Sequence, residues 1–114
     1  MSTTPDLFEA IISASYRYDD ASNGLLAAAH LHHLASADRE QPSETPVATT
    51  QLAVTIAAER IEHYSHLVDT ARSEAMYLVL GSTEAQIEAA RARLAGRRRD
   101  LAMLDRALGD AATL

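Results

Sequence analysis

Residues 46–80 read PVATTQLAVTIAAERIEHYSHLVDTARSEAMYLVL, and they carry an apolar residue at every seventh position. This series consists of Val47, Val54, Ile61, Val68 and Ala75, and a second apolar series lies between its members, namely Ala57, Tyr64, Ala71 and Leu78. Only an α-helix returns a residue to nearly the same face after seven positions. The stretch therefore predicts one long helix over about residues 46–80, with an apolar stripe along it.

The seven-residue pattern restarts after Gly81. Its members are Ile87, Leu94, Leu101 and Leu108, with Ala90 and Leu104 between them. Thr83 and Gln86 have the spacing of a capping box, in which each side chain bonds to the other residue's backbone amide. Gly109 is a typical helix stop. These signals predict a helix over about residues 83–108, joined to the preceding helix by a very short turn and packed antiparallel to it.

A third helix is predicted nearer the N-terminus, over about residues 5–38. Thr4-Pro5 matches Thr45-Pro46 as a start signal, because Thr caps free amides and Pro tolerates the first helical position. One apolar phase continues through the segment in Phe8, Ile11, Tyr18, Leu25, Ala29 and His32. Asn23-Gly24 is a turn-forming pair in the middle, so the helix is either continuous or kinked there.

The fold class that follows is all-α: an antiparallel, heptad-packed bundle of three long helices running up, down and up, in one domain of 114 residues. Alanine forms roughly a fifth of the chain and Trp is absent, which suits closely approaching helices. The residues expected in the core are Phe8, Ile11, Leu25, Val54, Ile61, Tyr64, Val68, Leu78, Ile87, Leu94, Leu101 and Leu104.

Apolar residues beyond Gly24 occupy more than one side of the first predicted helix. Ala27, Leu31 and Leu34 lie away from its main stripe. A helix that is apolar on two sides needs a second partner. We therefore expect the bundle to be completed by homo-oligomerisation, as a dimer or a larger assembly.

Composition excludes several function classes. The chain has no cysteine, which rules out disulfides, thiolate zinc sites and cysteine nucleophiles. Its net charge of −6 argues against general affinity for nucleic acid or anionic membranes. The N-terminus lacks the basic and apolar regions of a secretory signal, and histidines interrupt the longest apolar run, so the sequence predicts a cytoplasmic protein without a membrane segment.

Antiparallel pairing of the predicted helices places five polar residues at one height, in the middle of the bundle: Tyr18, Asp19, Asp20, Tyr64 and Arg97. The favoured interpretation is a structural layer that fixes register, with an inward Arg97 paired to Asp19 or Asp20. The alternative is an anion or ligand site, with Arg97 as donor and a tyrosine hydroxyl orienting the ligand.

A second group of polar residues is a potential metal site. Helical spacing gathers Glu59, Glu62, His63 and His66 within an arc of roughly 100°. His and carboxylate ligands suit zinc, iron or manganese. The arc lies opposite the apolar stripe, so in a monomer it faces water. We favour a solvated helix face, and the arc becomes an interior metal site only if oligomerisation covers it.

No nucleophile elbow, cofactor fingerprint or Ser/His/acid combination is recognisable in the chain. The sequence favours a non-catalytic helical interaction or assembly protein that homo-oligomerises and offers an acidic surface to a protein partner, with no cofactor. Two alternatives stay open. One is a metal- or small-ligand-binding bundle that uses the Glu/His strip, and the other is an acidic inhibitor or antitoxin-like protein.

Overall fold

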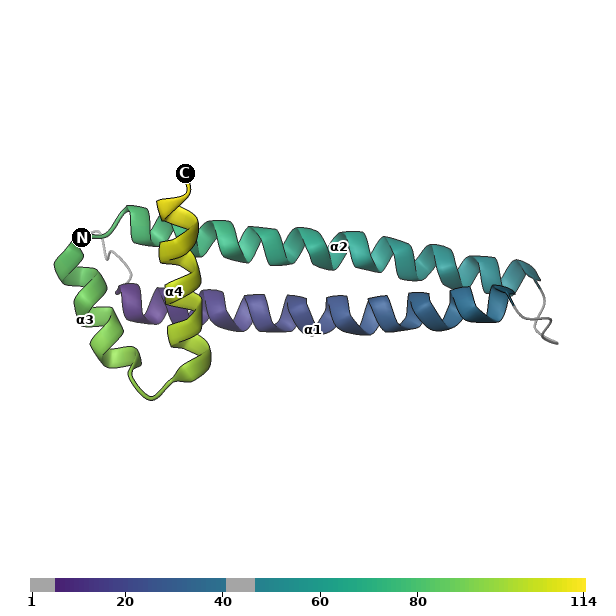
Figure 1. Cartoon of the computed structure of the whole chain (residues 1–114), viewed down its shortest axis with the longest axis horizontal. Helices are drawn as coiled ribbons and strands as arrows, with labels where there is room; N and C mark the ends of the chain where they lie inside the picture. Colours follow the sequence, from purple (N-terminus) through teal and green to yellow (C-terminus); the bar gives the residue numbers. More distant parts are fainter. Residues whose placement is uncertain (1–5, 41–46) are drawn as a thin grey trace. The chain divides into compact units, whose positions relative to one another are not determined.

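The computed structural model describes residues 6–40 and 47–114, and within them the chain is all-α with four helices. These are α1 (Leu7–Glu40), α2 (Val47–Leu80), α3 (Glu84–Leu94) and α4 (Arg98–Ala112). The two long helices, α1 and α2, pack antiparallel (Figure 1). No strand occurs in these two stretches, and none of their helices has the length and apolar character needed to cross a membrane.

The helices divide into two compact units. The first unit comprises Met1–Asp19 together with Asp69–Leu114, and the second comprises Asp20–Val68. Each unit therefore contains a piece of α1 and a piece of α2. The organisation as one domain stays a prediction.

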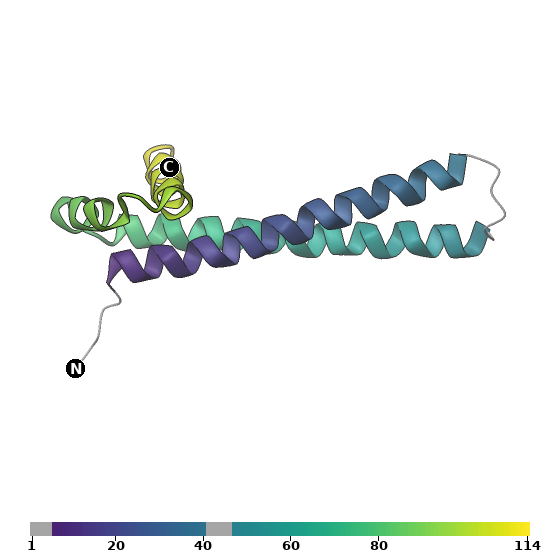
Figure 2. The same ribbon diagram turned by 90° about the horizontal axis from the view of Figure 1, so that it is seen from below.

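The first unit has the hydrophobic core. Its α3 and α4 form a hairpin that runs crosswise to the start of α1 and the end of α2 (Figures 1 and 2). The buried members of this core are Leu7, Ile11, Ala14, Ala75, Val79, Ala90, Leu94, Met103, Leu104 and Ala107. Four of these ten residues are alanines, which let the helix backbones approach closely and leave large apolar side chains to fill the remaining space.

The prediction of three long helices is wrong in its last element, because the predicted helix over residues 83–108 is two helices. Thr83 and Gln86 form the expected capping box at the start of α3. The helix then ends at Leu94, and Gly96 has a φ of 88°. Glycine adopts positive φ without the steric cost that a Cβ brings. Gly96 is therefore the residue that lets the chain leave α3 and reverse into α4.

One other predicted helix end is corrected, and of the two alternatives at Asn23-Gly24 the continuous helix is the one observed. Gly109 does not end the last helix, since α4 continues to Ala112. Asn23-Gly24 does not break the first helix, because α1 is continuous from Leu7 to Glu40. The bounds of α2, Val47–Leu80, agree with the prediction of about 46–80.

The second unit is a simpler structure, in which the pieces of α1 and α2 between Asp20 and Val68 pack on each other. Among the side chains described there, only Ala21, Ala28 and Ala57 are fully buried. The larger stripe residues Leu25, Val54 and Ile61 are only partly buried. This unit therefore has a narrow seam rather than a core.

The predicted core is confirmed in the sense that none of its members is exposed. Ile11, Leu94 and Leu104 are fully buried, whereas the others are partly buried. The prediction missed the contribution of small and flexible side chains, since Ala14, Ala75 and Met103 are at most 1% exposed.

Candidate interaction surface

The second unit exposes several large apolar side chains, and three of them lie together beside one groove, whereas Leu26, Leu52 and Leu67 are exposed outside it. Leu31 and Leu34 of α1 are 47% and 48% exposed, and Ile56 of α2 is 40% exposed. Together with three alanines they line a groove of about 360 Å³, which we call the apolar groove: Leu31, Leu34, Ala35, Ala53, Ile56 and Ala57. Solvation of such a surface is unfavourable, by about 25 cal/mol for each Å² of apolar area.

Helical geometry explains why these residues share a side. Leu31 and Leu34 lie on the same flank of α1, three residues apart, and Ala53 and Ile56 have the same spacing on α2. Because the two helices are antiparallel and their seam runs through Ala28 and Ala57, both pairs flank the seam on one side. The alanines form the floor of the groove and the larger residues its walls.

Among the residues that the structure describes, Arg60 is the one charged residue that lines the apolar groove. Its side chain is exposed, and within the described residues no ion pair involves it. A guanidinium beside an apolar surface commonly lays its methylene stem on that surface and directs its charge to a carboxylate or to water. Arg60 therefore gives the groove one position that favours an acidic partner group.

The predicted Glu/His strip lies on the exposed side of α2. Glu59, Glu62, His63 and His66 are all exposed, and the His63 ring packs edge-on against Tyr64 with 5.3 Å between centroids. In a single chain, residues 6–40 and 47–114 contain no group of three or more His, Asp or Glu side chains placed to hold a metal ion. A zinc, iron or manganese site on this strip stays a prediction that requires an assembled state.

The predicted polar layer is divided between the two units. Tyr18, Asp19 and Arg97 belong to the first unit, while Asp20 and Tyr64 belong to the second. Within the first unit Asp19 pairs with Arg99, at 3.0 Å, and not with Arg97. The prediction of Arg97 as an inward heptad residue is wrong, because its side chain is 53% exposed at the N-cap of α4.

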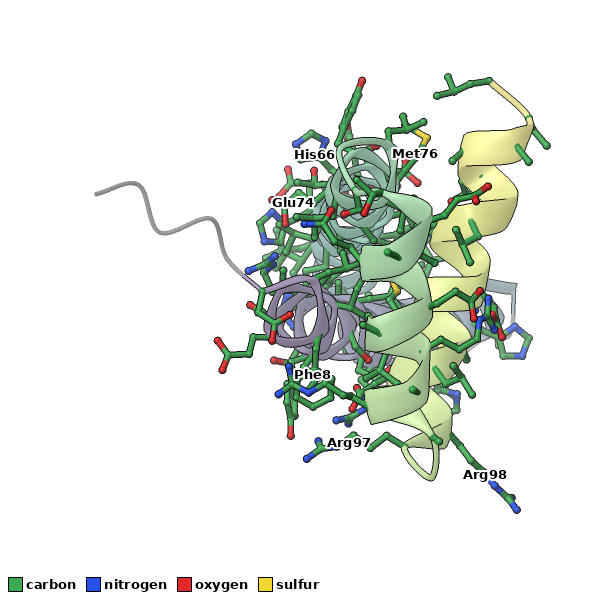
Figure 3. All side chains as sticks on the ribbon, turned by 90° about the vertical axis from the view of Figure 1, so that its left-hand side faces the viewer. Phe8, His66, Glu74, Met76, Arg97 and Arg98 are labelled. Carbon is green, nitrogen blue, oxygen red and sulfur yellow. The ribbon has the colours of Figure 1, made fainter. Side chains whose placement is uncertain are left out.

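Arginines of the first unit stack on aromatic side chains of α1, and we call this group the arginine–aromatic cluster. Arg93 and Arg97 lie over the Phe8 ring, Arg99 lies over Tyr16 and Arg106 lies over Tyr18. Figure 3 shows Phe8 and Arg97 on the same side of the unit, whereas Arg98 projects away from α4. Each contact joins α1 to the α3–α4 hairpin or its loop, so the cluster fastens the hairpin to α1.

The charges of the arginine–aromatic cluster are largely neutralised inside the unit. Arg93 pairs with Asp6, and Arg99 pairs with Asp19. The hydrogen bond with Tyr16, followed by the bond and the charge of Asp19, raises the pKa of Arg99 above its usual value. Paired guanidinium groups have little attraction left for a phosphate, which argues against an anion site here.

Asp100 is a buried carboxylate that does not belong to the predicted set of site residues. Its side chain is 5% exposed, and it lies between Arg97 and Arg99 at 3.7 and 3.6 Å. Its Oδ1 atom is buried and accepts no hydrogen bond from residues 6–40 or 47–114. The available signal was an acid three residues after a helix cap, where the helix dipole favours negative charge, but it appears only once the break at Gly96 is recognised.

A second groove, of about 630 Å³, lies in the first unit between α1 and α2. Ala10 and Leu78 line its apolar part, while Arg17 bonds to Ser13 at 3.0 Å and to Glu74 at 2.6 Å. Because Arg17 and Glu74 at its edge neutralise each other, these two charges do not point to a specific ligand.

The apolar groove of the second unit is therefore the strongest candidate for an interaction surface, since it combines exposed large apolar residues with a cation that has no partner in the described parts of the chain. Comparison with known proteins adds no assignment: no protein-family model, curated protein or solved structure matches this chain.

Proposed function

We propose that this protein is a non-catalytic helical interaction protein, which assembles with copies of itself through the apolar groove. The observation that carries the proposal is the exposure of Leu31, Leu34 and Ile56 on one side of the hairpin between Asp20 and Val68. Soluble monomers rarely leave contiguous apolar patches of this kind in water, and such patches mark protein interfaces.

Hairpin geometry supports the same function. Two antiparallel helices bury only the seam between them, and here the fully buried seam residues of the second unit are alanines. Two such hairpins packed face to face form a four-helix bundle, in which a second apolar face of each helix becomes interior. Self-assembly therefore supplies the core that this unit lacks.

The other part of the proposed function is recognition of a protein partner by an acidic surface. Between residues 20 and 68 the sequence holds six acids and two arginines. Glu59 and Glu62 are exposed on α2 and do not line the apolar groove. Self-assembly through the groove would leave this side of α2 available to a basic partner surface, with an association rate that falls as salt concentration rises.

Light scattering tests the proposal by measuring absolute molar mass in solution. We expect at least twice the 12.3 kDa of one chain. Ile56→Glu should lower the mass toward 12.3 kDa, because it removes an apolar wall of the groove and places in the interface a charged carboxylate whose desolvation is unfavourable. Ala58→Glu is the matched control, since Ala58 is exposed on the same helix outside the groove.

The comparison requires that both variants retain the helical circular dichroism of the wild type. A wild-type mass of one chain over the full accessible concentration range would contradict self-assembly. An equal loss of mass in both variants would contradict the assignment to the apolar groove.

A further inference from the structure

The shape of the apolar groove suits a second copy of the same groove. Its floor is made of the small residues Ala35, Ala53 and Ala57, and its walls are the branched residues Leu31, Leu34 and Ile56. A surface that offers both holes of alanine size and branched side chains is able to interdigitate with its own copy. Two-fold contacts of this isologous kind are the commonest form of homo-oligomer.

The charges of the second unit also favour a second copy of this chain in the groove. Arg60 lines the groove without an ion pair in the described residues. A second copy brings carboxylates with it, because acids outnumber arginines six to two between residues 20 and 68. Asp20 is exposed and has no ion pair in that part of the chain either, while Glu59 and Glu62 lie outside the groove and stay available to another partner.

The face around the groove is also large enough for a specific dimer. The pieces of α1 and α2 in this unit are each about 30 Å long, and two adjacent helices are about 20 Å wide, so the footprint is about 600 Å² per copy. Specific interfaces begin at about 600 Å² per partner. The contact therefore lies in the range of a small but specific interface.

We infer that the groove's occupant is a second copy of this chain, bound through its own apolar groove in a two-fold contact centred on Ala53 and Ile56. This inference rests on the proposed function and names the partner surface that self-assembly uses. It places Ala53 of one copy close to Ala53 of the other, because floor residues near a two-fold axis face their own counterparts.

Cysteine cross-linking tests this placement without interference, since the chain has no native cysteine. Ala53→Cys places a thiol on the floor of the groove, at an exposed residue. Ala58→Cys is the matched control, because five residues turn it about 140° away on the same helix. A disulfide forms only where two Cα atoms come within about 7 Å.

Mild oxidation of each full-length variant, followed by non-reducing electrophoresis, gives the readout, and light scattering of the reduced samples gives the mass. A dimeric mass with nearly complete disulfide-linked dimer for Ala53→Cys, and almost none for Ala58→Cys, supports the inference. A dimeric mass with linkage at Ala58→Cys instead, or at neither position, overturns the inference and leaves self-assembly standing. A single-chain mass for the wild type and both reduced variants overturns the proposed function as well.

Discussion

Tyr64 packs directly against the backbone of Gly24, so closely that a Cβ atom on residue 24 would lie 2.6 Å from the ring atoms Cδ1 and Cζ. Both residues belong to the unit between Asp20 and Val68. Gly24 is therefore not a break in α1. It is the position at which α1 makes room for a large side chain of α2.

Gly24→Ala is expected to destabilise the protein, against the usual preference of helices for alanine. The helix gains about 1 kcal/mol from the replacement, but overpacking against Tyr64 costs about 1–3 kcal/mol. We expect a net loss of about 1 kcal/mol, measured as a lower melting temperature by circular dichroism.

The control for this prediction removes the ring. In a Tyr64→Leu background the steric conflict disappears, so Gly24→Ala should then raise the melting temperature through helix propensity alone. An increase in melting temperature for Gly24→Ala in the wild-type background would contradict the close approach of the two residues.

The two glycines of the C-terminal hairpin are expected to respond in opposite directions to alanine. Gly96 has a φ of 88°, which costs a residue with a Cβ about 1 kcal/mol, so Gly96→Ala should destabilise the protein. Gly109 lies inside α4 with open space where a Cβ would stand, so Gly109→Ala should stabilise it by up to about 1 kcal/mol. Thermal unfolding of the two variants measures both effects. If both replacements changed the melting temperature in the same direction, the break between α3 and α4 would not depend on Gly96.

The sequence predicted helix content and the seam positions well, because periodicity reports which face of a helix is buried. It failed at the junction between α3 and α4 for a specific reason. Leu94 lies in α3 and Leu101 in α4, and both pack in or against the core. Their spacing of seven residues is the same as within one continuous helix, so the pattern does not reveal that the helix changes between them. Gly96 produces the break, but the spacing of the apolar residues is the same with or without it.

Prediction of the candidate site was less complete. The excess apolar character of Leu31 and Leu34 was visible in the sequence, and the structure adds Ala53 and Ile56 on the neighbouring helix. The pairing of arginines was not predictable, because a long side chain reaches several carboxylates from one helical position. The sequence pointed to Arg97, but the structure places Arg99 on Asp19.

Arg99 is expected to matter for stability, whereas its neighbour Arg98 is not. Arg99 contacts Asp19, lies over Tyr16 and approaches the buried Asp100. Arg99→Ala leaves the buried carboxylate with Arg97 as its remaining cation, so the melting temperature should fall. Arg98→Ala removes the same charge from a side chain that projects away from α4 (Figure 3), so it should leave the melting temperature unchanged. The same decrease in both variants would mean that only net charge is involved.

The ion pair between Arg72 and Asp110 should stabilise the first unit equally at neutral and moderately alkaline pH. Arg72 donates from Nε and Nη2 to the two carboxylate oxygens, at 3.2 and 2.8 Å. These bonds, with the charge of Asp110, raise the pKa of Arg72 above its ordinary value, against a smaller effect of burial. A raised pKa means that the contribution is fully present below the unfolded-state pKa and is lost only as pH rises through the higher folded-state value.

Arg72→Ala should therefore lower stability by about 1 kcal/mol or less, because both side chains are partly exposed. Arg72→Lys is the control that keeps the charge but not the two-bond geometry, and it should lose part of that amount. Thermal or urea unfolding of the wild type and Arg72→Ala measures the difference between pH 7 and about pH 9, well below the arginine pKa. The difference should stay constant over this window, since Arg72 remains protonated throughout. A difference that shrinks as pH rises would show that the stabilisation comes from another titrating group.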